Sequence, residues 1–221
     1  MKSTSFIFIN QLLQRRPVLS VCETAIIDAC EAIIACYNRK GKLLACGNGG
    51  SAADAGHIVG ELMKSFLLKR PVSPYFKDIL INLYSDGGEE LANQLQGALP
   101  AISLSEHAAL VTAVANDISA SMVYAQQVYG YGCKGDVLLA ISTSGYAANV
   151  VNAVKIAHGM DICTLCLTGQ SGGTLRYLCD IAICVPASST AEVQELHLPV
   201  YHTLCAVIEN ELFKGDQNDQ R

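Results

Sequence analysis

The sequence predicts a three-layer α/β/α sandwich around a central, mainly parallel sheet, with a helical segment added at the N-terminus. The first observation is a set of four apolar runs of strand length, at 42–46, 137–141, 162–167 and 181–185. The second is the helical pattern that follows these runs. Continuous apolar strands that alternate with helices indicate a parallel sheet covered on both faces. Residues 99–104 predict a weaker fifth strand, and a ligand should bind where the strands end.

Length and composition limit the classes of function. A chain of 221 residues has the size of one domain, so we expect a single domain over 1–221, with a helical segment at 1–40 and a frayed tail at 215–221. The net charge of −5 disfavours nucleic acid as a partner, because that role needs a basic surface. No run reaches the roughly 18 uncharged apolar residues of a membrane span, so we expect no membrane partner.

The ten cysteines indicate the compartment. Most of them lie inside apolar runs, as Cys46 does, and buried reduced thiols are typical of cytosolic proteins. Cys163 and Cys166 have a C-x-x-C spacing. Inside a strand, however, positions three apart face opposite ways, which favours buried thiols over redox chemistry. We therefore expect a cytoplasmic protein.

Two long helices are expected near the ends of the chain. The first covers 18–39, where apolar residues recur on one face. The last begins at Ser189, because Glu192 three residues later completes a capping box. It ends near Gly215, a typical C-cap residue. Pro199 should interrupt this helix, since proline lacks the amide hydrogen that a helix interior needs.

The region between 70 and 100 fits the alternation of strands and helices poorly. Asp86-Gly87-Gly88 predicts a turn there, because glycine tolerates the backbone angles of tight turns. The residues that follow, 89–99, predict a short helix.

A glycine-rich loop follows the first predicted strand. Residues 47–52 read Gly-Asn-Gly-Gly-Ser-Ala, which satisfies the G-x-G-x-x-A spacing of dinucleotide-binding loops. Those loops need an acidic residue about 20 positions later, where this chain has Lys69-Arg70-Pro71. A dinucleotide is therefore disfavoured, and the free amides at a helix start favour an anion or a polar sugar. A tight strand-to-helix turn without a ligand is the alternative.

A second polar loop follows the strand at 137–141. It contains Ser142, Thr143 and Ser144 before Gly145. Three hydroxyls beside the first amides of a helix can bind a phosphate, because the helix start carries roughly half a positive charge. Helix capping is the alternative, although a cap needs only one hydroxyl.

Four side chains offer donors for a divalent metal such as zinc. His57 and Glu61 share one helix face, because they are four residues apart. Gln194 and His202 are separated by about 80° around the last helix. Two imidazoles, a carboxylate and an amide oxygen form a plausible ligand set, whereas an ordinary surface pair of His57 and Glu61 is the alternative. His197 faces the opposite side of its helix and is expected to be structural.

Taken in order along the chain, these motifs resemble the sugar isomerase (SIS) domain family. The residues that carry the resemblance are Cys46–His57, Glu61, Leu138–Gly145, Thr168-Gly169, Gly172-Gly173, Gln194–His197 and His202. Within the family they are most similar to the phosphoheptose isomerases, which act on sedoheptulose 7-phosphate. The family's Asn-Asp pair before a helix is similar to Asn116-Asp117.

The resemblance implies an aldose–ketose isomerisation of a phosphorylated sugar in a homotetramer with active sites between subunits. It implies one zinc ion per subunit, held by His57, Glu61, Gln194 and His202. In that reaction we assign Glu61 as the base, as a metal ligand, or as both in turn, and His202 as its acid/base partner. The residues expected to bind the substrate are Asn48, Gly49, Gly50, Ser51, Asp117, Ser142, Thr143, Ser144 and Gln194.

Four departures from the family pattern leave the identity of the sugar open. Ala147 stands where relatives commonly have serine, and Glu192 stands where they often have arginine. Lys64-Ser65-Phe66 occupies the place of a basic residue after the base. Residues 72–98 read as an insertion relative to typical members. All four fall where sugar contacts are expected.

Two alternatives to an enzyme remain within the same family. One is a non-catalytic SIS protein that binds the bacterial replication initiator. That branch lacks the carboxylate and the imidazole that match Glu61 and His202, both of which are present here. The other is a sensor that binds a sugar phosphate without turnover. The absence of a hydroxyl at Ala147 would be consistent with such a role.

Overall fold

A five-stranded parallel sheet forms the centre of the molecule. The computed structural model describes residues 1–214, so the predicted C-cap at Gly215 and the tail at 215–221 lie outside the described residues. The strand order is β2-β1-β3-β4-β5. The strands are β1 (Leu43–Gly47), β2 (Ala101–Ser103), β3 (Val137–Ile141), β4 (Cys163–Thr168) and β5 (Ile181–Cys184). The predicted fold class and all five predicted strands are confirmed.

Helices surround the sheet and occupy most of the rest of the chain. The α-helices are α1 (Phe6–Arg15), α2 (Glu23–Asn38), α3 (Gly50–Met63), α4 (Pro74–Leu83), α5 (Gly88–Gln94), α6 (Ala108–Val114), α7 (Val123–Tyr131), α8 (Ala148–Gly159), α9 (Leu175–Leu178) and α10 (Thr190–Phe213). The shorter elements are the 3-10 helices η1 (Pro17–Cys22) and η3 (Ala120–Met122), and the π-helix η2 (Ala115–Ser119).

The first long helix differs from its prediction. It was expected over 18–39, but the chain forms η1 before α2 begins at Glu23. Leu19 and Cys22 are buried and stand three residues apart, which matches the three residues per turn of a 3-10 helix.

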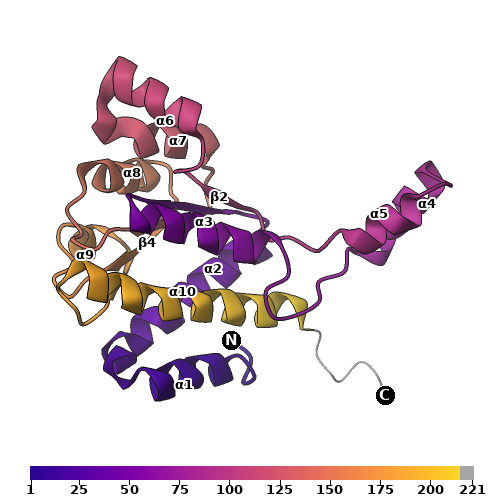
Figure 1. The fold of residues 1–221 in the computed structure, drawn as a ribbon, viewed down its shortest axis with the longest axis horizontal. Helices are drawn as coiled ribbons and strands as arrows, with labels where there is room; N and C mark the ends of the chain where they lie inside the picture. Colours follow the sequence, from indigo (N-terminus) through magenta and orange to yellow (C-terminus); the bar gives the residue numbers. More distant parts are fainter. Residues whose placement is uncertain (215–221) are drawn as a thin grey trace.

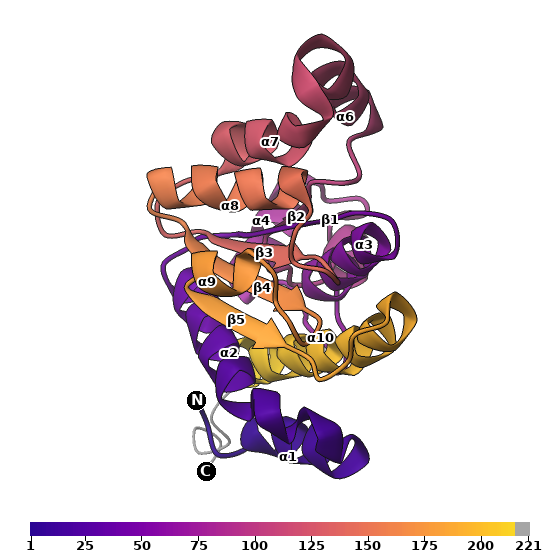
Figure 2. The same cartoon turned by 90° about the vertical axis from the view of Figure 1, so that its left-hand side faces the viewer.

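The two faces of the sheet pack against different helices. On one face Leu43, Val137 and Leu139 join a core with α2, α3 and α10. On the other face Leu44 and Leu138 join a core with α7 and α8. Figure 2 shows α7 and α8 above the strands, with α10 and α1 below them. This alternation is the geometry of a strand covered on both sides.

The last helix begins as predicted and continues through its proline. Ser189 accepts a hydrogen bond from the amide of Glu192, so the expected N-cap is present. Pro199 was expected to interrupt the helix, but α10 runs on to Phe213. Pro199 removes only one backbone hydrogen bond, and burial of Val200 and Leu204 directly after it holds the helix in place by tertiary packing.

The segment 72–98 forms a helical hairpin that projects from the body (Figure 1). The expected turn is present, with Gly87 at a left-handed φ of 93°, and the helix predicted over 89–99 is the shorter α5, which begins one residue earlier and ends at Gln94. The helix α4 was not predicted. Ser73 caps it by accepting from the amide of Phe76, and Pro74 occupies its first turn, where proline is favoured. No residue of α4 is buried, so little tertiary packing supports it.

One stretch, Ala108–Tyr131, is long and apolar enough to cross a membrane by length and composition alone. In the structure it is divided into α6, η2, η3 and α7. The division falls at Ser119, which has an extended backbone with φ −170° and ψ 142°. Val123 and Val128 of α7 lie in the core beside α8, so the end of the stretch packs as a core helix does.

Candidate active site

The helix that follows β1 carries the first two donors. His57 Nε2 lies 3.3 Å from Glu61 Oε1, so the pair shares a face of α3, as the i,i+4 spacing requires. The second carboxylate oxygen of Glu61 lies 3.2 Å from Lys64 Nζ. Glu61 is therefore held between an imidazole and an ammonium group.

The helix α10 brings His202 to the same place. Its Nε2 atom lies 3.4 Å from His57 Nε2, and its ring centroid lies 5.6 Å from that of Phe66. Burial lowers the pKa of His202 below its usual value, and the neighbouring His57 lowers that pKa further, while Glu61 opposes both effects. His202 is therefore neutral at neutral pH and can either accept or donate a proton.

Two further residues, which no local pattern indicated, lie behind His57: Tyr201, which contacts its ring, and Asp54, which contacts Tyr201. The hydroxyl of Tyr201 lies 3.1 Å from His57 Nδ1, and it donates a hydrogen bond of 3.2 Å to Asp54 Oδ1. Asp54 precedes His57 by three residues and Tyr201 precedes His202 by one. Periodicity along one helix gave no signal for this pair, because the contact joins two helices.

Gln194 lies against the glycine loop. Its side chain occupies the space that a Cβ on Gly50 would need, so residue 50 must be glycine for this approach. Among the described residues, no hydrogen bond joins Gln194 to His57, Glu61 or His202. The structure thus brings Gln194 to the start of α3, seven residues before His57 on that helix and eight residues before His202 on α10.

The glycine loop itself is tied to α8. Asn48 and Asn149 exchange two side-chain hydrogen bonds of 2.9 Å, and Tyr124 donates to Asn48 Oδ1 at 3.1 Å. Gly49 caps α3 with a positive φ of 57°, a conformation that glycine adopts readily. Ser51 is buried in the first turn of α3. The loops after β1 and β3 therefore lie side by side.

The three hydroxyls after β3 lie in the loop that leads into α8. Ser142 is buried and accepts a hydrogen bond from the amide of Gly145, whereas Ser144 is exposed and accepts from the amide of Tyr146. The N-cap of α8 is Ala147, without a side-chain hydrogen bond. The serines and Thr143 therefore do not cap α8, which removes the capping alternative.

A hollow of about 390 Å³ opens beside this loop. It lies where β3, β4 and β5 end, which is the position that parallel sheets use for ligands. The polar residues that line it are Thr143, Ser144, Gln170, Ser171 and Ser188.

Asp117 is not brought to the two histidines. It lies exposed in η2 and accepts a hydrogen bond of 2.8 Å from Asn116. Within residues 1–214, no contact joins it to Glu61 or His202.

The sequence profile of the SIS domain family matches residues 9–77 and 83–169. These two segments span more than half of the chain. The chain belongs to the SIS domain family. The predicted resemblance is confirmed.

Several relatives that this SIS domain protein resembles over most of its length are phosphoheptose isomerases. The one from Methylibium petroleiphilum is 39% identical over 201 residues, which cover 90% of this chain and 87% of the relative. The one from Laribacter hongkongensis is 35% identical over 95% of each chain. The solved phosphoheptose isomerase of Francisella tularensis is 32% identical and superposes with a TM-score of 0.74, covering 95% of this chain and 100% of that one.

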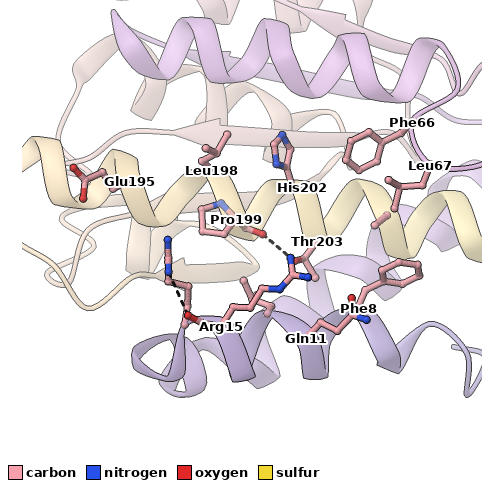
Figure 3. Close-up of a pocket in the computed structure, with 13 residues that line it drawn as sticks. Phe8, Gln11, Arg15, Phe66, Leu67, Glu195, Leu198, Pro199, His202 and Thr203 are labelled. Carbon is pink, nitrogen blue, oxygen red and sulfur yellow. Dashed lines mark hydrogen bonds between the residues drawn. The ribbon is translucent and has the colours of Figure 1, made fainter.

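A cavity of about 700 Å³ lies beside His202 in this SIS domain. Figure 3 shows His202 on α10 and Phe66 on the segment after α3, with Phe8, Gln11 and Arg15 of α1 on the opposite side. The exposed guanidinium of Arg15 adds positive charge to this wall. The cavity leaves His202 accessible from the surface.

A buried ion pair anchors the segment that carries Phe66. Glu209 of α10 accepts hydrogen bonds from Arg70 Nε at 2.6 Å and from the amides of Phe66 and Leu67 at 2.8 and 2.7 Å. Arg70 in turn donates to the carbonyls of Leu62 and Glu61 at the end of α3. Both charged side chains are at most 1% exposed. No local pattern in the sequence indicates this pair, because it joins residues 139 positions apart.

The donors for a metal are arranged as a chain and not as a closed set. His57 contacts both Glu61 and His202, but no ion pair between Glu61 and His202 is found among the described residues. In the same part of the chain, no group of three or more His, Cys, Asp and Glu side chains is arranged as a metal site. The His57–Glu61 and His57–His202 separations are the parts of the expected arrangement that the structure contains.

Proposed function

We propose that this SIS protein is an aldose–ketose isomerase of phosphoheptose isomerase type. Its substrate is sedoheptulose 7-phosphate, converted to D-glycero-D-manno-heptose 7-phosphate, or a related sugar phosphate. The observation that carries the proposal is the approach of both Glu61 and His202 to the Nε2 atom of His57. A protein that only binds a partner or a sugar has no need for a carboxylate and a neutral imidazole at this distance.

The reaction moves a proton between C1 and C2 of the sugar. Glu61 removes the proton from one carbon and returns it to the other. His202 moves the accompanying proton between the two sugar oxygens, and its lowered pKa suits both directions of that transfer. Positioned groups of this kind contribute roughly 10²–10⁴-fold each to a rate.

The phosphate is bound by the loops after β1 and β3. Asn48 and Ser51 supply polar groups from the first loop, with the amides of Gly49 and Gly50 at the start of α3. The second loop supplies Ser142, Thr143 and Ser144. The N-terminus of α3 adds its partial positive charge, so a phosphate can be held without lysine or arginine. Gln194 lies over this loop and contacts the sugar, and Asp117 reaches a sugar hydroxyl in the assembled enzyme.

Zinc is the metal that the donor set fits best. Zinc bonds to histidine nitrogen measure about 2.0–2.1 Å, so two ligands in a tetrahedral site lie roughly 3.3 Å apart. His57 Nε2 is 3.3 Å from Glu61 Oε1 and 3.4 Å from His202 Nε2. A zinc ion held by His57, Glu61, His202 and Gln194 would act as a Lewis acid at the sugar carbonyl.

The protein works as a homotetramer in the cytoplasm, with neither a nucleic acid nor a membrane as its partner. The exposed apolar residues of α1 and of the α4–α5 hairpin, such as Ile7, Tyr75 and Leu83, support an assembly in which further surface is buried. The division of the apolar stretch 108–131 into short elements supports the absence of a membrane partner.

A panel of sugar phosphates tests the proposal. Purified protein is mixed with seven-, six- and five-carbon ketose and aldose phosphates, and both binding and interconversion are measured. We expect turnover of at least one pair and no binding of the unphosphorylated sugars. Binding without turnover of any pair would instead identify a sugar-phosphate sensor, and the absence of both would contradict the phosphosugar assignment.

A further inference from the structure

The contacts behind His57 determine which of its two nitrogens carries a proton. Asp54 is a carboxylate and therefore only accepts hydrogen bonds. Within residues 1–214, Asp54 Oδ1 accepts a hydrogen bond from Tyr201, and the other carboxylate oxygen, Oδ2, is buried without a partner. The hydroxyl hydrogen of Tyr201 must then point toward Asp54.

The oxygen of Tyr201 has only lone pairs left for His57. Its distance to His57 Nδ1 is 3.1 Å, which is a hydrogen-bond distance. Because the hydroxyl hydrogen is committed to Asp54, the hydrogen of this second bond must come from the imidazole. His57 Nδ1 therefore carries a hydrogen, and in the neutral imidazole this is the Nδ1–H tautomer.

In the neutral Nδ1–H tautomer, the other nitrogen of His57 presents a lone pair. This Nε2 atom faces Glu61 Oε1 at 3.3 Å and His202 Nε2 at 3.4 Å. An unprotonated nitrogen repels a carboxylate oxygen at that distance unless a cation lies between them. The arrangement is that of a ligand atom and not of a proton donor.

We propose that Asp54 and Tyr201 are positioning residues that fix His57 in the Nδ1–H tautomer and keep its Nε2 lone pair aimed at Glu61 and His202. His57 is thereby reserved for binding a cation, and the proton transfers are left to Glu61 and His202. The metal part of this inference rests on the proposed function. The tautomer does not, because it follows from the three hydrogen-bonding groups alone.

The fold favours this positioning role because it holds the hydroxyl of Tyr201 in a fixed place. Tyr201 is 1% exposed, and its ring meets that of His57 edge to face at 5.5 Å. Its position on α10 is next to His202, so one helix supplies both a catalytic side chain and the group that orients the histidine opposite. Outer groups that orient a metal-binding histidine typically contribute 10–100-fold to metal affinity.

The tautomer is measured directly by nitrogen NMR of histidine in metal-free protein at pH 7.5. We expect the His57 Nδ1–H form in the wild type. Tyr201→Phe removes the hydroxyl and keeps the ring, so His57 should no longer prefer the Nδ1–H tautomer over the Nε2–H tautomer. Asp54→Asn is the sharper change, because its amide can donate to Tyr201 and release the hydroxyl hydrogen toward Nδ1, which should favour the Nε2–H form.

Zinc affinity, measured by competition with a chelator, is the second readout. Both variants should bind zinc 10–100-fold more weakly than the wild type. Tyr37→Phe is the control, because its hydroxyl contacts the carbonyl of Pro100 away from the site, and it should change neither readout. Melting curves establish that each variant is folded. Two variants are used so that the test still stands if one of them does not fold.

The outcomes separate this inference from the function on which it partly rests. A wild-type His57 in the Nε2–H or the doubly protonated form overturns the proposal that Asp54 and Tyr201 fix the Nδ1–H tautomer. So does a Tyr201→Phe or Asp54→Asn protein with unchanged tautomer and unchanged zinc affinity. A wild type that binds no zinc contradicts the metal of the proposed function. The NMR result alone then decides whether Asp54 and Tyr201 fix the tautomer of His57.

Discussion

His57 and His202 stand 145 residues apart in the sequence, and their Nε2 atoms approach to 3.4 Å across two helices. Their rings are nearly perpendicular, with an interplanar angle of 86°, so each presents its nitrogen to the other without stacking. The helices α3 and α10 pack against the same face of the sheet. The site therefore depends on the packing of these two helices.

Replacement of Glu61 with glutamine should abolish turnover. The amide cannot take a proton from carbon, whereas it keeps the shape of the side chain between His57 and Lys64. Binding of the phosphosugar should stay within a few-fold of wild type, because the hydroxyl loop is unchanged. Rates and binding constants measured on the same preparation test this. More than about a tenth of the activity remaining would show that Glu61 is not the base.

Replacement of His202 with alanine should lower both the zinc content and the melting temperature in the presence of zinc. A ligand that binds only the folded state stabilises it, and the change removes one of the four proposed donors. His107→Asn is the control, because His107 is exposed and caps α6. His197, though on the same helix, is fully buried and is unsuitable as a control. Zinc should also be released below about pH 6, since only neutral imidazole coordinates.

Less than about a tenth of an equivalent of zinc per subunit in wild-type protein supplied with excess zinc would contradict that prediction. Equal zinc contents in the His202→Ala and wild-type proteins would remove His202 from the ligand set while leaving the other donors in place.

Replacement of Glu209 with glutamine should destabilise the fold by about 3 kcal/mol, because breaking one partner of a buried ion pair leaves the other charge uncompensated. The carboxylate accepts from Arg70 and from three consecutive amides, and an amide group brings a donor into that position. Urea unfolding measures the loss. Glu195→Gln on the same helix is exposed and should change stability by less than about 0.5 kcal/mol.

The same variant should lose activity even at temperatures where it is folded, because Glu209 and Arg70 hold Phe66 beside His202 and fix the end of α3 next to Glu61. Full activity in a destabilised Glu209→Gln protein would limit the pair to a structural role.

Stability should fall as the pH drops from about 6.5 to 4 because of His197. Burial lowers the pKa of His197 from its ordinary 6.5 to about 4, with the backbone of Thr168 partly opposing. The unfolded chain therefore takes up a proton in this window and the folded chain does not, so unfolding becomes easier as pH falls. The full difference amounts to about 3 kcal/mol. Melting curves of His197→Gln should lack this part of the pH dependence, and equal pH slopes in both proteins would contradict it.

The local pattern of the sequence was sufficient for the strands and for the contact within α3. Each strand was predicted from a run of mainly apolar residues, because a strand buried on both faces is built mostly from apolar side chains. His57 and Glu61 could be paired from their spacing, since residues four apart on a helix are neighbours whatever surrounds them. Ser189 predicted the start of α10 for the same reason, because a cap acts within one turn.

Local signals failed where packing competes with propensity. Pro199 predicts a broken helix, yet the buried residues around it keep α10 continuous. The helix α4 gave no recognised signal, although Ser73 and Pro74 are a helix start in hindsight. Asp117 matched a family motif, yet it lies exposed in η2, away from the two histidines among the residues described.

The sequence by itself determined the layers of this protein, the loops at the strand ends and the identity of Glu61, His57 and His202 as candidate site residues. The tertiary structure alone decided that Tyr201 and Asp54 orient His57, and that Glu209 and Arg70 anchor the segment beside His202. The physical reason is range. Propensity, capping and periodicity act over a few residues, whereas a hydrogen bond or a buried ion pair between α3 and α10 exists only after both helices have packed on the sheet.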